Sequence, residues 1–136
     1  MTPAEIVDTM MAKDSFSHWL GIKVLEVKEG YCRLWMRITN DMLNGFGIAH
    51  GGITYSLADS ALAFASNSKG PKSVSIETSI AHITGLKEND EIIAEASCVT
   101  ETAKLGHYHI KVYLESNPAQ PAALFKGMVY KKKENW

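Results

Sequence analysis

The sequence lacks the features that mark secreted, membrane-spanning or nucleic-acid-binding proteins. It has only two cysteines, Cys32 and Cys98, and both lie in apolar, strand-like runs that form no secreted disulfide framework. With 14 basic and 15 acidic residues and a net charge of −1, no overall field attracts nucleic acid or an anionic membrane. The longest apolar-rich stretch, residues 53–65, contains Asp59 and falls short of the roughly 20 residues of a membrane span. We therefore expect a soluble protein in the reducing cytoplasm.

A regular pattern of apolar residues is present instead, and it begins with short helices followed by a strand. The length of 136 residues suits one domain over residues 1–136, and the first 14 residues lack the basic start and apolar core of a signal peptide. Residues 2–5 and 15–20 predict two short helical segments. From Tyr31 to Ile38 the even positions are apolar and the odd positions aromatic or basic, which indicates a strand. We expect it to pair with residues 23–27.

A long helix and further strands complete the predicted fold. Good helix formers run from Gly51 to about Ser68, and they are apolar on almost every side, so we expect this helix to be buried. Four strand-like runs follow without an intervening helix, and we expect them to pair as antiparallel hairpins: 73–83, 91–101, 106–115 and 122–132. The pattern predicts an α+β fold in which about five or six antiparallel strands wrap around a central hydrophobic helix.

The stretch from Leu43 to Asp59, LNGFGIAHGGITYSLAD, carries the chemistry that we predict. Its four glycines allow the backbone to approach a ligand closely. Gly51 and Gly52 lie at the predicted helix start, where free N–H groups and the helix dipole favour an anion or a developing oxyanion. Glycine pairs at helix starts often serve turn geometry alone, so this feature by itself is weak. It becomes specific only together with an acid.

Asp59 supplies that acid, two turns into the otherwise apolar helix. A buried carboxylate is costly unless it is paired or used in chemistry. One interpretation is a structural aspartate hydrogen-bonded by Ser60 or Thr54; the other is a general base or nucleophile whose pKa is shifted by its surroundings. Asp59 alone does not decide between them.

The spacing of Gly51 and Asp59 adds a prediction about assembly. Eight residues at 1.5 Å per residue place them roughly 12 Å apart along the helix. One reacting carbonyl cannot be served by both within one chain, because donor and base must each come within about 3 Å of their atoms. If the two cooperate, Asp59 must face Gly51 of another subunit. A two-fold axis beside the helix would create two such sites, so we expect an obligate dimer.

The motif resembles that of hotdog-fold thioesterases of the phenylacetic-acid-degradation (PaaI) type. The residues that carry the resemblance are Leu43-Asn44-Gly45, His50-Gly51-Gly52 and Ser56-Leu57-Ala58-Asp59, with Asn67-Ser68 following. The resemblance implies hydrolysis of an acyl- or aryl-acyl-CoA thioester to a carboxylic acid and free CoA, without cofactor or metal. It also implies dimers that share their active sites and pair into tetramers.

The same resemblance implies a role for each site residue. Asp59 would act as general base or nucleophile, and the N–H of Gly51 would polarise the thioester carbonyl. Asn44 would place the water and the carbonyl, while His50 would position the loop. Gly52 and Ser60 are the further substrate-binding residues that we predict.

Several points stay open at this stage. Relatives often carry an arginine and a proline near the position of Thr84-Gly85, and this chain has neither, so Lys87 or Lys104 are the substitutes that we consider for CoA phosphate binding. A non-catalytic acyl-CoA-binding module and a hotdog dehydratase or hydratase using His50 are the alternative functions. Trp19 and Trp35 are candidates for an acyl pocket, with core packing as the default. His107 and His109 have no third metal ligand at suitable spacing.

Overall fold

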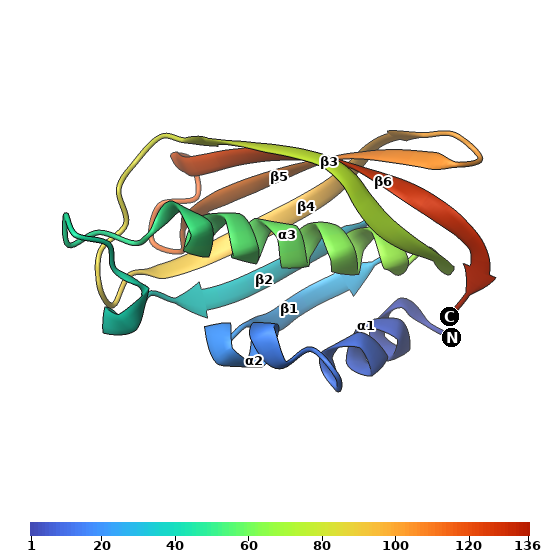
Figure 1. The fold of residues 1–136 in the computed structure, drawn as a ribbon, viewed down its shortest axis with the longest axis horizontal. Coiled ribbons are helices and arrows are strands. Elements are labelled where there is room, and N and C mark those ends of the chain that lie inside the picture. Colours follow the sequence, from blue (N-terminus) through green and yellow to red (C-terminus); the bar gives the residue numbers. More distant parts are fainter.

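The computed structural model describes residues 1–136 as one curved sheet with helices on its concave side (Figure 1). In chain order the elements are α1 (Pro3–Met11), α2 (Ser15–Leu20), β1 (Lys23–Lys28), β2 (Tyr31–Arg37), the 3-10 turn η1 (Asn40–Met42), α3 (Gly51–Asn67), β3 (Pro71–His82), β4 (Glu91–Glu101), β5 (Leu105–Leu114) and β6 (Pro121–Asn135). The predicted helices and strands are all present. No helix has the length and apolar character needed to cross a membrane.

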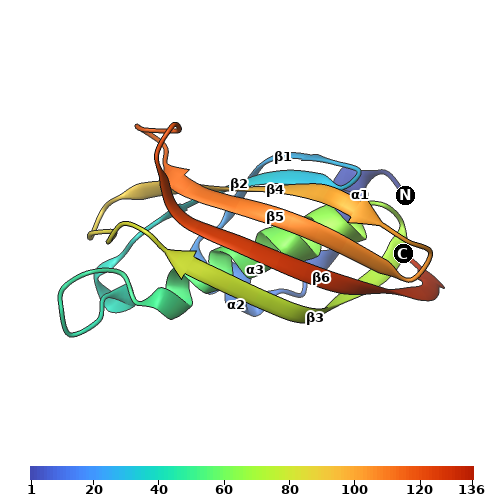
Figure 2. The same ribbon diagram turned by 90° about the horizontal axis from the view of Figure 1, so that it is seen from above.

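The six strands form an antiparallel sheet in the order β1-β2-β4-β5-β6-β3. The expectation that the last four strands pair in sequence as hairpins is wrong for β3, which crosses over to pair with β6. The physical reason is that α3 fills the concave face between β2 and β3, so the chain returns at the far edge of the sheet. Figure 2 shows β1 and β3 at opposite edges with α3 beneath the strands. One side of β3 is therefore left without a strand partner.

The core lies between α3 and the concave face of the sheet. Leu34 and Met36 of β2 are fully buried there, as their alternation with polar residues predicts, and they share one apolar cluster with Leu57 and Phe64 of α3. The helix approaches the sheet closely over β6, because a Cβ built on Gly127 would lie 2.6 Å from Cδ2 of Leu62. Because α3 is held on the sheet by this packing, the positions of Gly51 and Asp59 on the helix are held as well.

The expectation that α3 is buried on nearly every side is wrong for one stripe of the helix. Gly52 is exposed, and Ser56, Asp59 and Ala63 are partly exposed, although all four lie inside the helix that the sequence predicts to be buried. Their spacing of three or four residues places them on a single helix face. The curved sheet and the two short helices cover the other faces, and no element of the chain covers this one.

Candidate active site

The N-terminus of α3 offers one free backbone N–H group. His50 is the N-cap residue, and its Nδ1 accepts the Gly52 N–H at 2.9 Å. The N–H of Gly51, the first residue of the helix, donates to no acceptor of its own chain. Helix N-termini normally leave such donors for a cap, water or a ligand. His50 thus holds the helix start and leaves Gly51, rather than Gly52, as the donor available to a carbonyl oxygen.

Asn44 lies in the loop that leads into this helix start. Its side-chain Oδ1 accepts the N–H groups of Phe46 at 2.9 Å and Ile48 at 3.4 Å, which orders the loop tip. Gly47 has a φ of 78°, a conformation that suits glycine. The amide oxygen of Asn44 is therefore occupied by the loop, and its NH₂ group is the part left to contact a substrate.

Asn44 and Gly51 line one hollow of about 280 Å³, here called the Gly51 hollow. The structure thus brings together two of the residues that the sequence places at the carbonyl end of the site. The same hollow is also lined by His82, which the sequence analysis missed. The sequence contains a signal for it. His82 lies two positions after Ile80 in the same strand, so both side chains point to the same face of the sheet, and Ile80 packs on the core.

Asp59 lines a second hollow of about 360 Å³, here called the Asp59 hollow. Burial raises the pKa of the Asp59 carboxyl above its usual range, and no hydrogen bond or charge opposes that shift. Neither Ser60 nor Thr54 bonds to its carboxylate, so the hydrogen bonds expected of a structural aspartate are absent. The Ser60 hydroxyl instead lies 3.0 Å from that of Ser17, which joins α2 to α3. Asp59 is a partly desolvated acid without a partner in its own chain.

Trp136 lines the Asp59 hollow. The indole N–H donates to Oδ1 of Asn67 at 2.8 Å, and the Trp136 backbone N–H donates to the Gly70 carbonyl at 3.0 Å. Asn67 is itself buried, and its Oδ1 also accepts the Ser73 N–H at 2.8 Å. The rest of the lining is mixed: apolar Met10, Leu62, Ala63, Val74 and Val129, together with polar Ser66, Lys72, Ser73, Ser75 and Lys132. A fixed aromatic wall therefore bounds this hollow.

The two tryptophans that the sequence suggested for an acyl pocket lie elsewhere. Trp19 is 52% exposed and stacks on Phe16, with ring centroids 6.1 Å apart, so the default of core packing is also wrong for it. Trp35 faces away from α3 and lies beneath the cations of Lys23 and Arg37. The aromatic wall comes instead from Trp136, in a segment that the sequence analysis left without a site role.

The two hollows share no lining residue, so the Gly51 end and the Asp59 end are separate within one chain. This separation agrees with the roughly 12 Å that eight helical residues span. Gly52 and Ser60 line neither hollow. Lys87 follows Leu86, a lining residue of the Gly51 hollow, whereas Lys104 lies in the turn between β4 and β5.

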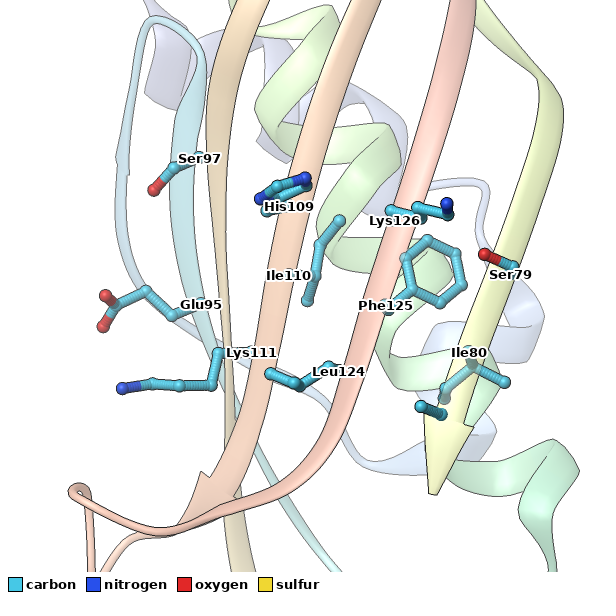
Figure 3. Close-up of a pocket in the computed structure, with 11 residues that line it drawn as sticks. Ser79, Ile80, Glu95, Ser97, His109, Ile110, Lys111, Leu124, Phe125 and Lys126 are labelled. Atoms are coloured by element: carbon cyan, nitrogen blue, oxygen red, sulfur yellow. The ribbon is translucent and has the colours of Figure 1, made fainter. Parts of the chain in front are cut away.

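A hollow of about 510 Å³ lies on the opposite face of the sheet and contains none of the motif residues (Figure 3). Its outward-facing side chains include Glu95, His109, Lys111 and Lys126, which come from β4, β5 and β6. Volume alone does not make it the site, because it holds neither a free helix N–H nor a desolvated acid. No group of three or more His, Cys, Asp or Glu side chains is arranged to hold a metal ion.

Comparison with known proteins identifies the family. Residues 46–119 match the thioesterase superfamily. The chain belongs to that family. This thioesterase is 37% identical over 131 residues to a protein of Archaeoglobus fulgidus, which covers 96% of this chain and 84% of the relative. It is 32% identical over 118 residues to acyl-coenzyme A thioesterase PaaI of Escherichia coli, covering 87% and 83% respectively.

A solved structure extends the match over the whole fold. The structure of the E. coli PaaI protein from the phenylacetic acid degradation operon matches with a TM-score of 0.93 and 28% sequence identity, over 98% of this chain and 95% of that one. The predicted α+β hotdog fold and the resemblance to PaaI-type thioesterases are therefore confirmed. The chain is a PaaI-like thioester hydrolase.

Proposed function

We propose that this thioesterase hydrolyses acyl-CoA thioesters to a carboxylic acid and free CoA at a site shared by two subunits. The proposal is carried by the presence on one helix of an unused N–H at its start and of an unpartnered, partly desolvated carboxylate. Thioester hydrolysis needs both groups, because charge develops on the carbonyl oxygen while water is activated. The name of the E. coli relative, acyl-coenzyme A thioesterase PaaI, supports CoA as the thiol.

In this mechanism the thioester carbonyl oxygen accepts the Gly51 N–H of one subunit. The NH₂ group of Asn44 lies on the same hollow and orients the carbonyl or the attacking water. Asp59 of the other subunit removes a proton from water, and its raised pKa makes it a stronger base than a solvated carboxylate. Direct attack by Asp59 on the carbonyl carbon uses the same geometry: the C–S bond breaks, CoA leaves as the thiolate, and water then cleaves the mixed anhydride to the acid and free Asp59.

The edge strand β3 provides the surface on which two subunits meet. Only β6 pairs with β3, and its other side presents unpaired backbone groups along a strand of 12 residues. Val74 and Ile76 of this strand are 45% and 54% exposed. A long edge strand with exposed apolar side chains is a template for pairing with another chain. Pairing of β3 with its counterpart in a second copy would continue the sheet across the interface.

Two hydrogen-bonded contacts fix the position of α3 along the length of β3. The Tyr55 hydroxyl lies 2.5 Å from that of Thr78, and Asn67 Oδ1 accepts the Ser73 N–H. The helix runs twelve residues between these contacts, or about 18 Å, and the strand runs five residues, or about 16 Å. Helix and strand therefore run side by side in opposite directions.

The alignment of α3 along β3 indicates where the two-fold axis of the proposed dimer would lie. Asp59 lies four residues after Tyr55, about 6 Å along the helix, which places it level with Ile76. By the same measure Gly51 lies level with about residue 80. An axis that crosses β3 near Thr78 therefore brings Asp59 of one subunit beside Gly51 of the other. The uncovered stripe of α3 would face the same axis.

The acyl group would then extend from the carbonyl into the Asp59 hollow. Trp136 bonds to Asn67, which lies eight residues beyond Asp59, so the hollow is roughly 12 Å long. The apolar part of its lining, with Leu62, Val74 and Trp136, suits an aryl-acetyl or a medium-chain acyl group. The E. coli PaaI protein is described as part of a phenylacetic acid degradation operon, which supports phenylacetyl-CoA among the substrates to test.

The direct test replaces Asp59 by asparagine and measures release of free thiol from a panel of acyl-CoAs. Loss of a general base lowers kcat by about 10²–10⁴-fold, and the variant should keep the oligomeric state of the wild type in light scattering. Asp8→Asn makes the same chemical change at an exposed site of α1 and should leave turnover unchanged.

Each outcome of the panel separates the alternatives. Turnover by Asp59→Asn at the wild-type rate would contradict the proposal. Binding of acyl-CoA by the wild type without thiol release would indicate a binding module, and double-bond chemistry without release would indicate a dehydratase or hydratase that uses His50.

A further inference from the structure

His82 is the one titratable side chain at the carbonyl end of the site that the proposed mechanism leaves unused. It is the last residue of β3 and pairs with Ala123 of β6. His82 lies four positions after Thr78 in the strand, so both side chains point to the same face. Thr78 bonds to Tyr55 of α3, which shows that this is the helix side of the sheet. Its side chain is exposed and lines the Gly51 hollow, and no group of the chain is hydrogen-bonded to the ring.

The imidazole lies directly against Gly51. A Cβ built on Gly51 would be 3.1 Å from Nε2 of His82 and 3.4 Å from its Cε1. A Cβ lies about 2.5 Å from the backbone nitrogen of its own residue, so Nε2 is at most about 5.6 Å from the Gly51 nitrogen. A carbonyl oxygen that accepts two hydrogen bonds of about 2.9 Å along its lone-pair directions holds the donors about 5 Å apart, which lies within that bound. The two nitrogens can therefore reach the same oxygen atom.

We propose that His82 is a second hydrogen-bond donor to the thioester carbonyl oxygen, beside the Gly51 N–H. This inference rests on the proposed function. In it, the Nε2–H group of His82 donates to the oxygen and keeps its proton throughout. The negative charge that develops on the oxygen, when water or Asp59 adds to the carbonyl carbon, is shared between the two donors. No proton is transferred by His82, and the charge is relieved when the C–S bond breaks and CoA leaves.

This role differs in a testable way from simple packing of a ring over Gly51. His82→Phe keeps a ring of similar shape and removes both nitrogens, whereas His82→Gln removes the ring and keeps an N–H donor. We expect His82→Phe to lower kcat by about 10²-fold with little change in KM, because the donor acts mainly in the transition state. His82→Gln should recover a measurable part of that loss. His107→Phe on β5 is the matched control and should turn over as the wild type.

A spectroscopic measurement tests the same inference without turnover. With acyl-CoA bound to the slow Asp59→Asn variant, the carbonyl stretching frequency should fall below that of the thioester in water, and adding His82→Phe should move it back upward. Wild-type kcat in His82→Phe, an unchanged frequency in the double variant, or equal losses in the Phe and Gln variants would each overturn the role of His82. Full activity of Asp59→Asn would instead overturn the proposed function.

Discussion

Mixing two inactive variants should restore activity, because each defect belongs to a different half of a shared site. The first variant is Asp59→Asn, and the second is Gly51→Pro, which removes the N–H that we assign to the carbonyl oxygen. Proline suits this position, since Gly51 is the first residue of α3 and His50 has φ −58° and ψ 138°, the extended conformation favoured before proline. The helix should therefore stay intact while its free donor is lost.

The expected recovery follows from counting sites. Alone, Asp59→Asn should lose about 10²–10⁴-fold in kcat, and loss of one oxyanion donor in Gly51→Pro should cost about 10²–10³-fold. Random exchange at equal concentrations puts half of the dimers into mixed pairs. Each mixed pair contains one site with both defects and one with neither, so total activity should rise to about a quarter of the wild-type value.

The assay measures thiol release by the equimolar mixture and by co-expressed, doubly tagged mixed dimers, each against both parents. The purified mixed dimers have one intact site in two, so they should reach about half of the wild-type activity. Gly51→Ala is the matched control, because it keeps the N–H and adds a Cβ that His82 must accommodate at 3.1 Å. Because Gly51→Ala keeps the N–H donor, mixing it with Asp59→Asn should give no more activity than Gly51→Ala contributes by itself. Mixed dimers that stay at the level of the parents would refute the shared site. So would full activity in a monomeric protein.

Two further predictions concern stability and packing. Burial raises the pKa of Asp59 in the folded chain above its usual value of 3.8, so its contribution to the free energy of unfolding is favourable below that pH and is lost as pH rises through the folded pKa. Asp59→Asn should therefore unfold at a higher temperature than the wild type at pH 7, with the gap closing toward pH 4, and a lower Tm at pH 7 would contradict this. Gly127→Ala should cost about 1–3 kcal/mol in urea unfolding, because its Cβ would lie 2.6 Å from Leu62, whereas Gly45→Ala, which meets no atom within 4 Å, is the control.

The sequence was sufficient to predict the elements and the separation of the two half-sites. Alternation from Tyr31 to Ile38 identified β2 and its buried face, since period two is visible within one strand. The eight-residue spacing of Gly51 and Asp59 predicted two separate hollows, because the rise of a helix is fixed. Both inferences depend on local geometry alone.

Features that depend on distant segments could not be predicted in this way. The crossover of β3 to β6 is set by where α3 packs, and the position of Trp136 is set by that crossover, because β6 leads directly to it. His82 reaches Gly51 for the same reason. The alternation within one strand predicts the face of the sheet to which a side chain points. It does not predict which other element the side chain contacts there.

The uncovered stripe of α3 and the unpaired edge of β3 have one common physical explanation. Neither has a partner in an isolated chain, since no element covers the stripe and the edge leaves backbone groups without strand partners. They lie side by side, because Tyr55 and Asn67 bind β3 along the whole helix. A single two-fold contact near Thr78 would therefore cover both at once. The same contact would remove water from around Asp59, so that assembly and the basicity of the acid would rise together.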